Sequence, residues 1–265
     1  MWGGSRLHLE PSFPPLLSAF HNLGVNAEKD VSAAQILSFA YAQGTRIASS
    51  ELEYAKPIAN ASIFAEYLAI PAIQDNTAVR SLANLTLTLN AVNPNGLRET
   101  YWVATFKLNE DFTAWAVDMY YEELLGVANV AGLTPALTLQ VITVPMLREF
   151  AKKGGNALGL REEDGPLLLL QSNMMWQDAQ DDERILATNK RVIDRAVAEG
   201  TTRKLGMEYI YMNYASQFQA VMRSYGEESL AKLKRVARMY DPNGVFQRLQ
   251  PGYFKLDGAP ATWEG

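Results

Sequence analysis

Apolar residues along the chain follow two periods, one of about two residues that is typical of strands and one of about 3.6 that is typical of helices. Alternation in residues 34–42 and 46–56 predicts two antiparallel strands that turn at Gln43-Gly44. Residues 110–125 carry apolar side chains at helical spacing, which predicts an amphipathic helix. The same patterns predict strands over residues 2–10, 99–108, 134–143, 167–176 and 209–215, and helices over residues 11–23, 62–68, 77–91, 145–152, 178–199 and 227–239.

The C-terminal third has the clearest element boundaries. Residues 209–215 are rich in Tyr and Ile, which suit a pleated surface, so we predict a strand whose Asn213 and Tyr214 point to opposite faces. The helix over residues 227–239 is followed by Asp241-Pro242-Asn243-Gly244. Proline cannot continue a helix and glycine accepts a left-handed turn, so the helix is predicted to end there.

The order of the elements predicts the fold class. Most predicted strands are separated by helices, and one pair forms a hairpin. We therefore predict an α+β fold, a mostly antiparallel sheet with helices packed on one face and the other face open to a pocket or a partner. Residues 1–256 are expected to form one domain and residues 257–265 a loose C-terminal tail.

Composition and charge exclude several classes of function. The chain has 265 residues, of which 48% are hydrophobic and 20% are charged, and a net charge of −5. An acidic chain lacks the basic face expected of a nucleic-acid partner. No apolar run is long enough to span a membrane, and no N-terminal signal peptide is seen, so we expect a cytoplasmic protein without a membrane partner.

The residues that hold metals and form covalent bonds to cofactors are scarce. The chain has no cysteine, which excludes disulfides, a thiolate nucleophile and a cysteinyl-flavin bond. Its two histidines, His8 and His21, exclude a histidine-rich metal site, and we expect no metal. The acidic cluster in residues 178–183 is interpreted as a solvated helix start, and the glycine-rich residues 154–159 as tight turns, since they lack the lysine of a phosphate loop.

An ordered set of motifs resembles a known family. Together they resemble the C-terminal half of FAD-linked oxidases of the berberine-bridge-enzyme-like group, of the PCMH type, from Trp2-Gly3-Gly4 to Leu256. The matching segments are Ile36–Tyr41, Glu53 to Pro57, Phe64 to Pro71, Gly154 to Gly159, Asp164-Gly165-Pro166, Trp176 with residues 181–183, Asn213-Tyr214-Ala215, the helix start Tyr225-Gly226-Glu227-Glu228, Arg235 with Tyr240 to Phe246, and Pro251 to Leu256.

This resemblance implies a fold and a cofactor. In the family, such a half is a substrate-binding domain whose open sheet face roofs a flavin. FAD is therefore implied, yet most of its site belongs to the N-terminal FAD-binding half, which this chain is expected to lack. The cofactor of this chain alone is accordingly expected to be FAD or none.

By the same resemblance, Asn213 and Tyr214 are the candidate catalytic residues and lie near the flavin edge, which also makes them candidate cofactor contacts. A phenol can act as acid or base where a neighbour shifts its pKa. The alternative is that Tyr211 and Tyr214 are core aromatics whose hydroxyls have partners.

A second set of side chains is predicted to bind substrate. On the hairpin, Glu53 shares a face with Glu51, and Tyr54 with Lys56, because strand residues alternate. A solvated strand face or core packing are the alternatives for this set. The predicted substrate-binding residues are Tyr41, Glu53, Tyr54, Trp102, Phe106, Gln140, Met174 and Tyr211.

Three functions remain open. The first is a FAD-linked oxidoreductase acting on a small biosynthetic intermediate of secondary metabolism, reduced to its substrate-binding half, with Tyr214 as candidate base. The second is a cofactor-independent cyclase or isomerase of the pericyclase kind, which holds its substrate in a reactive geometry. The third is a non-catalytic binding or assembly partner. In each case we expect a homodimer, or a complex with a separate flavin-domain chain, because an open apolar face attracts partners.

Overall fold

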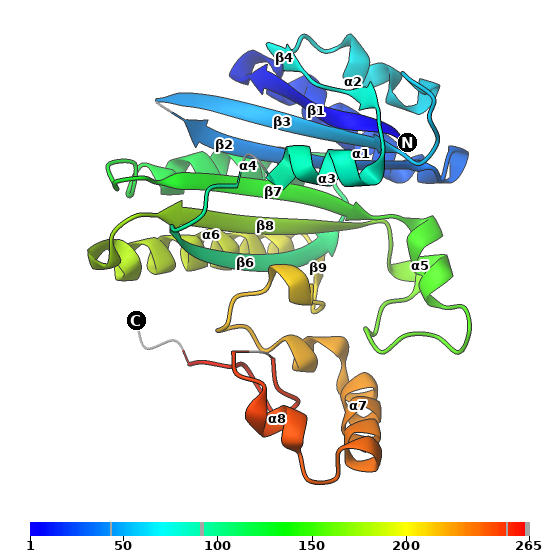
Figure 1. The fold of residues 1–265 in the computed structure, drawn as a ribbon, viewed down its shortest axis with the longest axis vertical. Helices are drawn as coiled ribbons and strands as arrows, with labels where there is room; N and C mark the ends of the chain where they lie inside the picture. The colour runs from blue at the N-terminus through cyan, green and yellow to red at the C-terminus, as the bar shows by residue number, and fades with distance from the viewer. Residues whose placement is uncertain (43, 91–92, 253, 263–265) are drawn as a thin grey trace.

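The computed structural model describes residues 1–262 except 43, 91–92 and 253. In this part of the chain nine strands form one sheet, in the order β4-β1-β3-β2-β7-β8-β6-β9, with β5 also paired to β1 (Figure 1). Every one of these pairings is antiparallel, where the sequence predicts a mostly antiparallel sheet. The strands are β1 (Trp2–Leu9), β2 (Ala33–Ala42), β3 (Thr45–Tyr54), β4 (Gln74–Asp75), β5 (Ala78–Val79), β6 (Arg98–Lys107), β7 (Thr134–Ile142), β8 (Leu167–Trp176) and β9 (Gly206–Met207).

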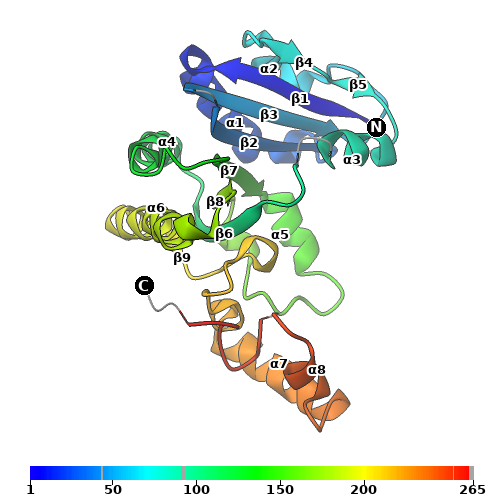
Figure 2. The same cartoon turned by 60° about the vertical axis from the view of Figure 1, so that its left-hand side comes forward.

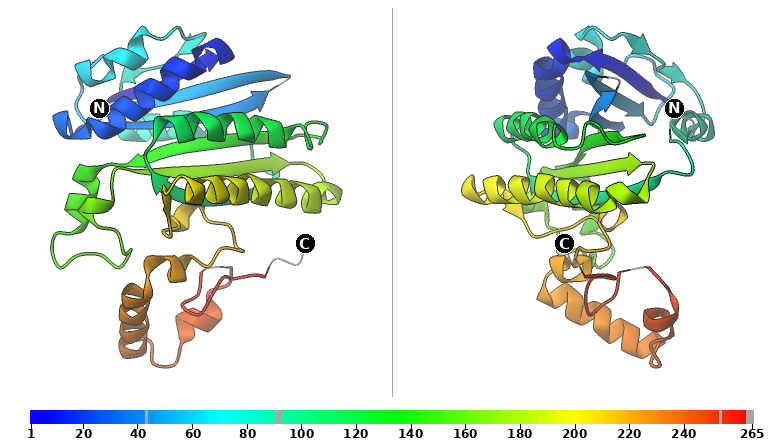
Figure 3. Two further views of the ribbon diagram at one scale, coloured as in Figure 1. Left: turned by 180° about the vertical axis from the view of Figure 1, so that it is seen from behind. Right: turned by 90° about the vertical axis from the view of Figure 1, so that its left-hand side faces the viewer.

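Three long helices cover one face of this sheet. In the left view of Figure 3, α1, α4 and α6 lie side by side in front of the strands, and the right view shows α3 on the opposite side of the sheet near the N-terminus. The predicted α+β class with helices on one face is confirmed, and no helix in the described ranges is both long and apolar enough to cross a bilayer. The helices are α1 (Phe13–Val25), α2 (Ala65–Ala69), α3 (Leu82–Asn90), α4 (Glu110–Leu124), α5 (Val144–Phe150), α6 (Asp182–Thr202), α7 (Glu227–Tyr240) and α8 (Val245–Leu249).

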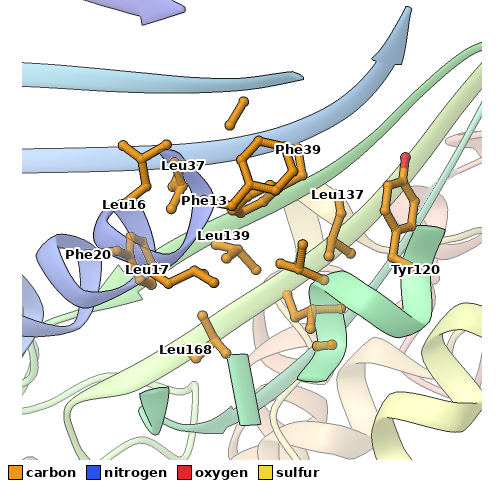
Figure 4. Packing of buried hydrophobic residues seen from close by; sticks show 14 of the residues in the cluster. Phe13, Leu16, Leu17, Phe20, Leu37, Phe39, Tyr120, Leu137, Leu139 and Leu168 are labelled. Atoms are coloured by element: carbon orange, nitrogen blue, oxygen red, sulfur yellow. The ribbon is translucent and has the colours of Figure 1, made fainter. Parts of the chain in front are cut away.

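The main core lies between the sheet and these three helices. Along β2 the odd positions Leu37 and Phe39 are fully buried, whereas the neighbouring even positions 36, 38 and 40 are half-buried. Figure 4 shows Leu37 and Phe39 with Leu137 and Leu139 of β7, near residues of α1 such as Phe13. Burying a large apolar side chain contributes about 1.5–3 kcal/mol, so this layer fixes which face of each strand looks inward.

The segment after β9 departs from the prediction. Residues 209–215 do not form a strand: β9 ends at Met207, and Met212–Tyr214 form a short 3-10 helix, η6. Tyr209 instead packs on Tyr225, with ring centroids 5.7 Å apart, in a second apolar cluster that covers one end of β8. The backbone N–H of Ile210 donates to the Ser224 hydroxyl at 3.0 Å, so it is not available for strand pairing.

The predicted end of α7 is confirmed. The helix stops at Tyr240, and Gly244 adopts φ +62°, a conformation that glycine accepts at little cost. The Asp241 carboxylate accepts hydrogen bonds from the backbone N–H groups of Val245 and Phe246 at 2.7 and 3.0 Å, and so begins α8. In Figure 2, α7 and α8 extend beyond the edge of the sheet as a separate group of helices.

The start of one predicted helix also differs from the pattern. The helix predicted over residues 77–91 begins only at Leu82, because Ala78 and Val79 pair with β1 as strand β5, and residue 91 lies outside the described residues. The hairpin of β2 and β3 is confirmed, although Gln43 of its predicted turn also lies outside them. In the predicted tail, Asp257 pairs with Lys234 at 2.7 Å, and the extent of the domain stays a prediction.

Candidate functional site

The sheet face that points away from α1, α4 and α6 carries a continuous set of polar side chains, here called the open face. Strand residues alternate between faces, and the register aligns Glu51 of β3 with Ile36 of β2 and Gln140 of β7 across the sheet. The polar residues that this register places on the open face include Ser38, Ser49, Glu51, Glu53, Tyr101, Thr138, Gln140, Gln171 and Asn173.

Two carboxyl groups stand out on this face. Glu51 and Glu53 are two positions apart on β3, so both side chains lie on the open face. Burial and, to a smaller extent, the neighbouring Glu53 carboxylate together raise the pKa of Glu51 to about 7. Burial also raises the pKa of Glu53. A carboxyl group with a pKa near neutrality is suited to accept or donate a proton at physiological pH.

The short helix η6 places two tyrosines over this face. The rings of Tyr211 and Tyr214 meet edge to face with centroids 4.9 Å apart, and the Asn213 side-chain amide donates to the Tyr211 hydroxyl at 2.9 Å. Burial raises the pKa of Tyr214, as do Tyr211 and Glu51, while a hydrogen bond with Gln140 lowers it. Tyr214 therefore stays a neutral phenol that can donate a hydrogen bond close to Glu51 and Gln140.

The structure thus brings together one group of the predicted site residues. Glu53 and Gln140 lie on the open face, and beside it lie Asn213 and Tyr214 on η6 and Tyr211 directly before η6. The prediction that Asn213 and Tyr214 point to opposite faces of a strand is wrong, because these residues form a 3-10 helix.

The other predicted residues lie elsewhere. Trp102, Phe106 and Met174 alternate onto the helix-covered face and are at most 5% exposed in the main core, so they cannot line a pocket with Gln140. Tyr54 lies on that face too, and its hydroxyl donates to Asp30 at 2.7 Å. Tyr41 lines a different cavity of about 420 Å³ near the β2–β3 turn. Trp102 and Phe106 also line a cavity of about 570 Å³ beside β9, so a binding role for these five residues stays a prediction, at places separate from the open face.

Sequence reasoning overlooked two residues of the open face as site residues. Glu51 has the more strongly shifted pKa of the two carboxyls, and Tyr101 interacts with Tyr214. The signal for Glu51 was present, since a Glu-Leu-Glu triplet in a strand with one buried face puts both carboxyls on the other face. Tyr101 gave no such signal, because its neighbours on β6 are mostly aromatic or apolar.

The raised pKa of Glu51 makes stability depend on pH. Its pKa is about 7 in the folded protein against an ordinary value of 4.5, so the folded state binds this proton more tightly than the unfolded state does. The stabilisation that results from this proton is complete below the ordinary pKa of 4.5, and it is lost as the pH rises through the folded-state pKa of about 7. We expect the free energy of unfolding to fall by about 2 kcal/mol over this window, and Glu51→Gln to remove that fall.

Urea unfolding at several pH values between these two pKa values measures the effect. Glu183→Gln, which changes an exposed carboxyl on α6, is the matched control and should keep the wild-type slope. An identical pH slope in wild type and Glu51→Gln would contradict the shifted pKa.

The chain is similar to curated proteins whose names state a cofactor. Over 97% of its length the chain is 31% identical to the FAD-dependent monooxygenase FUP4 of Fusarium proliferatum and 30% identical to the FAD-dependent monooxygenase tpcD of Cochliobolus heterostrophus. It covers 52% of each of these proteins, so it spans about half the length of the curated relatives that it matches. No family model matches the chain.

Solved structures share the fold. Over 97% of the chain, the 6-hydroxy-D-nicotine oxidase of Arthrobacter nicotinovorans superimposes with a TM-score of 0.72 at 16% identity, and the chain covers 55% of it. The H104A variant of berberine bridge enzyme superimposes over 99% of the chain with a TM-score of 0.66 at 12% identity, again with 55% of that protein covered. The chain is thus similar in sequence to FAD-dependent monooxygenases over about half of their length, and it shares its fold with these two solved oxidases.

The FAD named for these relatives suits one part of the described structure. Gln140, Asn213 and Tyr214 offer hydrogen-bonding groups that fit the edge of a flat heteroaromatic ring. The carboxyls of Glu51 and Glu53 would repel a diphosphate on the same face. Among the described residues the sheet is antiparallel throughout, without the parallel strand–helix–strand unit that binds dinucleotides. The open face therefore fits the ring of FAD and not its nucleotide end.

Proposed function

We propose that this chain forms the substrate-binding side of a FAD-linked oxidoreductase that acts on a small intermediate of secondary metabolism. The observation that carries the proposal is the open face, where Glu51 with a pKa near 7 lies close to Tyr214 and Gln140. The FAD-dependent relatives support the redox chemistry, and bound FAD would supply the hydride acceptor. Substrate would lie between the flavin ring and the open face.

The residues of the open face have distinct tasks in this proposal. Glu51, as a carboxylate, takes the proton that leaves a substrate O–H or N–H when the adjacent carbon is oxidised. Tyr214 stays protonated because its pKa is raised, so it donates a hydrogen bond to the substrate instead of acting as the base. Gln140 can donate and accept, and it orients the same polar group.

A second polypeptide segment has to bind the nucleotide end of FAD. The α7–α8 unit offers a surface for it, because Met239, Tyr240, Phe246 and Leu249 are each at least 67% exposed. Large apolar side chains that cluster on an exposed surface usually contact a partner. The proposed partner is a flavin-binding segment like the remaining half of the relatives, either in the same protein or in a separate chain.

Reconstitution tests the proposed function. The chain is co-expressed with the N-terminal half of the Fusarium proliferatum relative, and the complex is purified through a tag on the chain. We expect a yellow complex whose blue absorption band shifts with pH around the pKa of Glu51, and no such shift with Glu51→Gln. Phe246→Asp should weaken co-purification at least tenfold, whereas Val25→Asp, an exposed position on α1, should not.

Two outcomes would overturn the proposal. One is the absence of any flavin-containing complex when both halves are folded. The other is conversion of a substrate by the flavin-free chain at the rate of the complex, which would favour the cyclase or isomerase alternative.

A further inference from the structure

A cavity of about 590 Å³ lies where α1 and α5 meet the ends of β2 and β7, here called the α1–α5 cavity. Its size is within the range of small-molecule sites, about 300–1,000 Å³. Most of its wall is apolar, including Leu23, Val31, Val141, Pro145, Met146 and Phe150. The proposed redox site does not use these residues.

The α1–α5 cavity borders the open face through two of its lining residues. Ala34 and Gln140 line the cavity, and both belong to the open face. Ala34 pairs directly with Glu53, and Ile36 pairs with both Glu51 and Gln140. Adjacent strands are about 4.8 Å apart, so the backbones at Glu51 and Gln140 are separated by about 10 Å. A single small molecule can therefore span from Glu51 into the cavity.

The chemistry of the wall selects for a neutral, apolar occupant. Glu149 is the one charged residue of the lining, and it is already paired with Lys152. The Gln35 amide is also occupied, since it donates to the Phe20 carbonyl at 2.7 Å and accepts from the Tyr67 hydroxyl at 2.6 Å. Met146 and Phe150 provide adaptable and aromatic surface. Nothing in this lining offers a counter-ion to an anionic group.

We propose that the α1–α5 cavity binds the apolar tail of the substrate, and that its oxidisable polar end lies beside Glu51. The inference rests on the proposed function and narrows its substrate class to elongated, uncharged molecules with a polar group at one end. Tail binding holds the polar end in place, which lowers the entropic cost of reaching the reactive geometry.

A neutral fluorescent probe tests the cavity without flavin or partner. N-phenyl-1-naphthylamine is titrated into the purified chain, and we expect saturable binding that 1-decanol displaces and sorbitol does not. Met146→Trp fills the rim of the cavity, and Val31→Glu adds a charge there; both positions are partly or largely exposed, so the fold should persist. Each variant should weaken probe binding at least tenfold.

Two control variants identify the site of binding. Leu87→Trp on α3 changes an exposed residue outside the cavity, and Phe246→Asp removes apolar surface from α8. Both should leave probe affinity within twofold of wild type. Unchanged affinity in Met146→Trp and Val31→Glu, or loss of binding in Phe246→Asp alone, would overturn the tail site. If the yellow complex still formed in that case, the proposed function would stand and only the tail site would fail.

Discussion

Replacing Glu51 by Gln is expected to slow anaerobic flavin reduction in the reconstituted complex by roughly 100- to 10,000-fold, the usual contribution of a positioned general base. Glutamine keeps the size and hydrogen-bonding capacity of the side chain but cannot accept a proton. The measurement is stopped-flow bleaching of the blue absorption band, with a substrate found by screening neutral alcohols and phenols that carry an apolar tail.

The pH profile separates this role from a purely structural one. In the wild type the rate should fall as the pH drops below about 7, because Glu51 becomes protonated. Glu53→Gln removes the charge that helps to raise the pKa of Glu51, so it should move this fall to lower pH without abolishing the reaction. A Glu51→Gln complex with wild-type rate and profile would exclude Glu51 as the base.

Replacing Arg6 by Met is expected to destabilise the fold by about 3–5 kcal/mol, the cost of leaving the partners of a buried charge unpaired. Arg6 lies on β1 and is 7% exposed. Its guanidinium donates to the backbone carbonyls of Tyr67 and Ile70 and to the Asp75 carboxylate at 2.9 Å. It therefore joins the segment that contains α2 and β4 to the sheet edge.

Urea unfolding measures this loss, with a surface ion pair as the control. Lys234 and Asp257 form an exposed pair, so Lys234→Met should cost less than about 1 kcal/mol. Equal costs for the two variants would show that the Arg6 contacts contribute no more than a solvated pair does.

The long elements of this fold are readable from sequence because one buried face imposes a regular period. Strand β8 and helix α4 match their predicted ranges to within about one residue, because each packs on the main core along its length. Residues 209–215 also alternate, but the aromatic side chains there pack in a separate cluster and the backbone leaves the sheet. Alternation alone does not reveal which of these two outcomes tertiary packing selects.

The candidate site was predicted only in part for a related reason. Residue type suggested that Trp102, Phe106 and Met174 bind substrate, whereas the pleat places all three under the helices. Glu53 and Tyr54 are consecutive, so they could never share a face. Deciding which face is open requires the helix positions, and the shifted pKa of Glu51 depends on burial that no local pattern encodes.

The edges of the sheet have a consequence for how the isolated chain behaves. Both strands at the ends of the order, β4 and β9, are only two residues long. β9 pairs with only Thr105 and Phe106 of the ten-residue strand β6, and beyond it the Gln219 side chain hydrogen-bonds the backbone N–H and C=O of Val103. Among the described residues, no strand lies beside residues 98–102 of β6 on that side. An unpaired edge is a template for an incoming strand, so strand-to-strand association of two copies is expected to begin there.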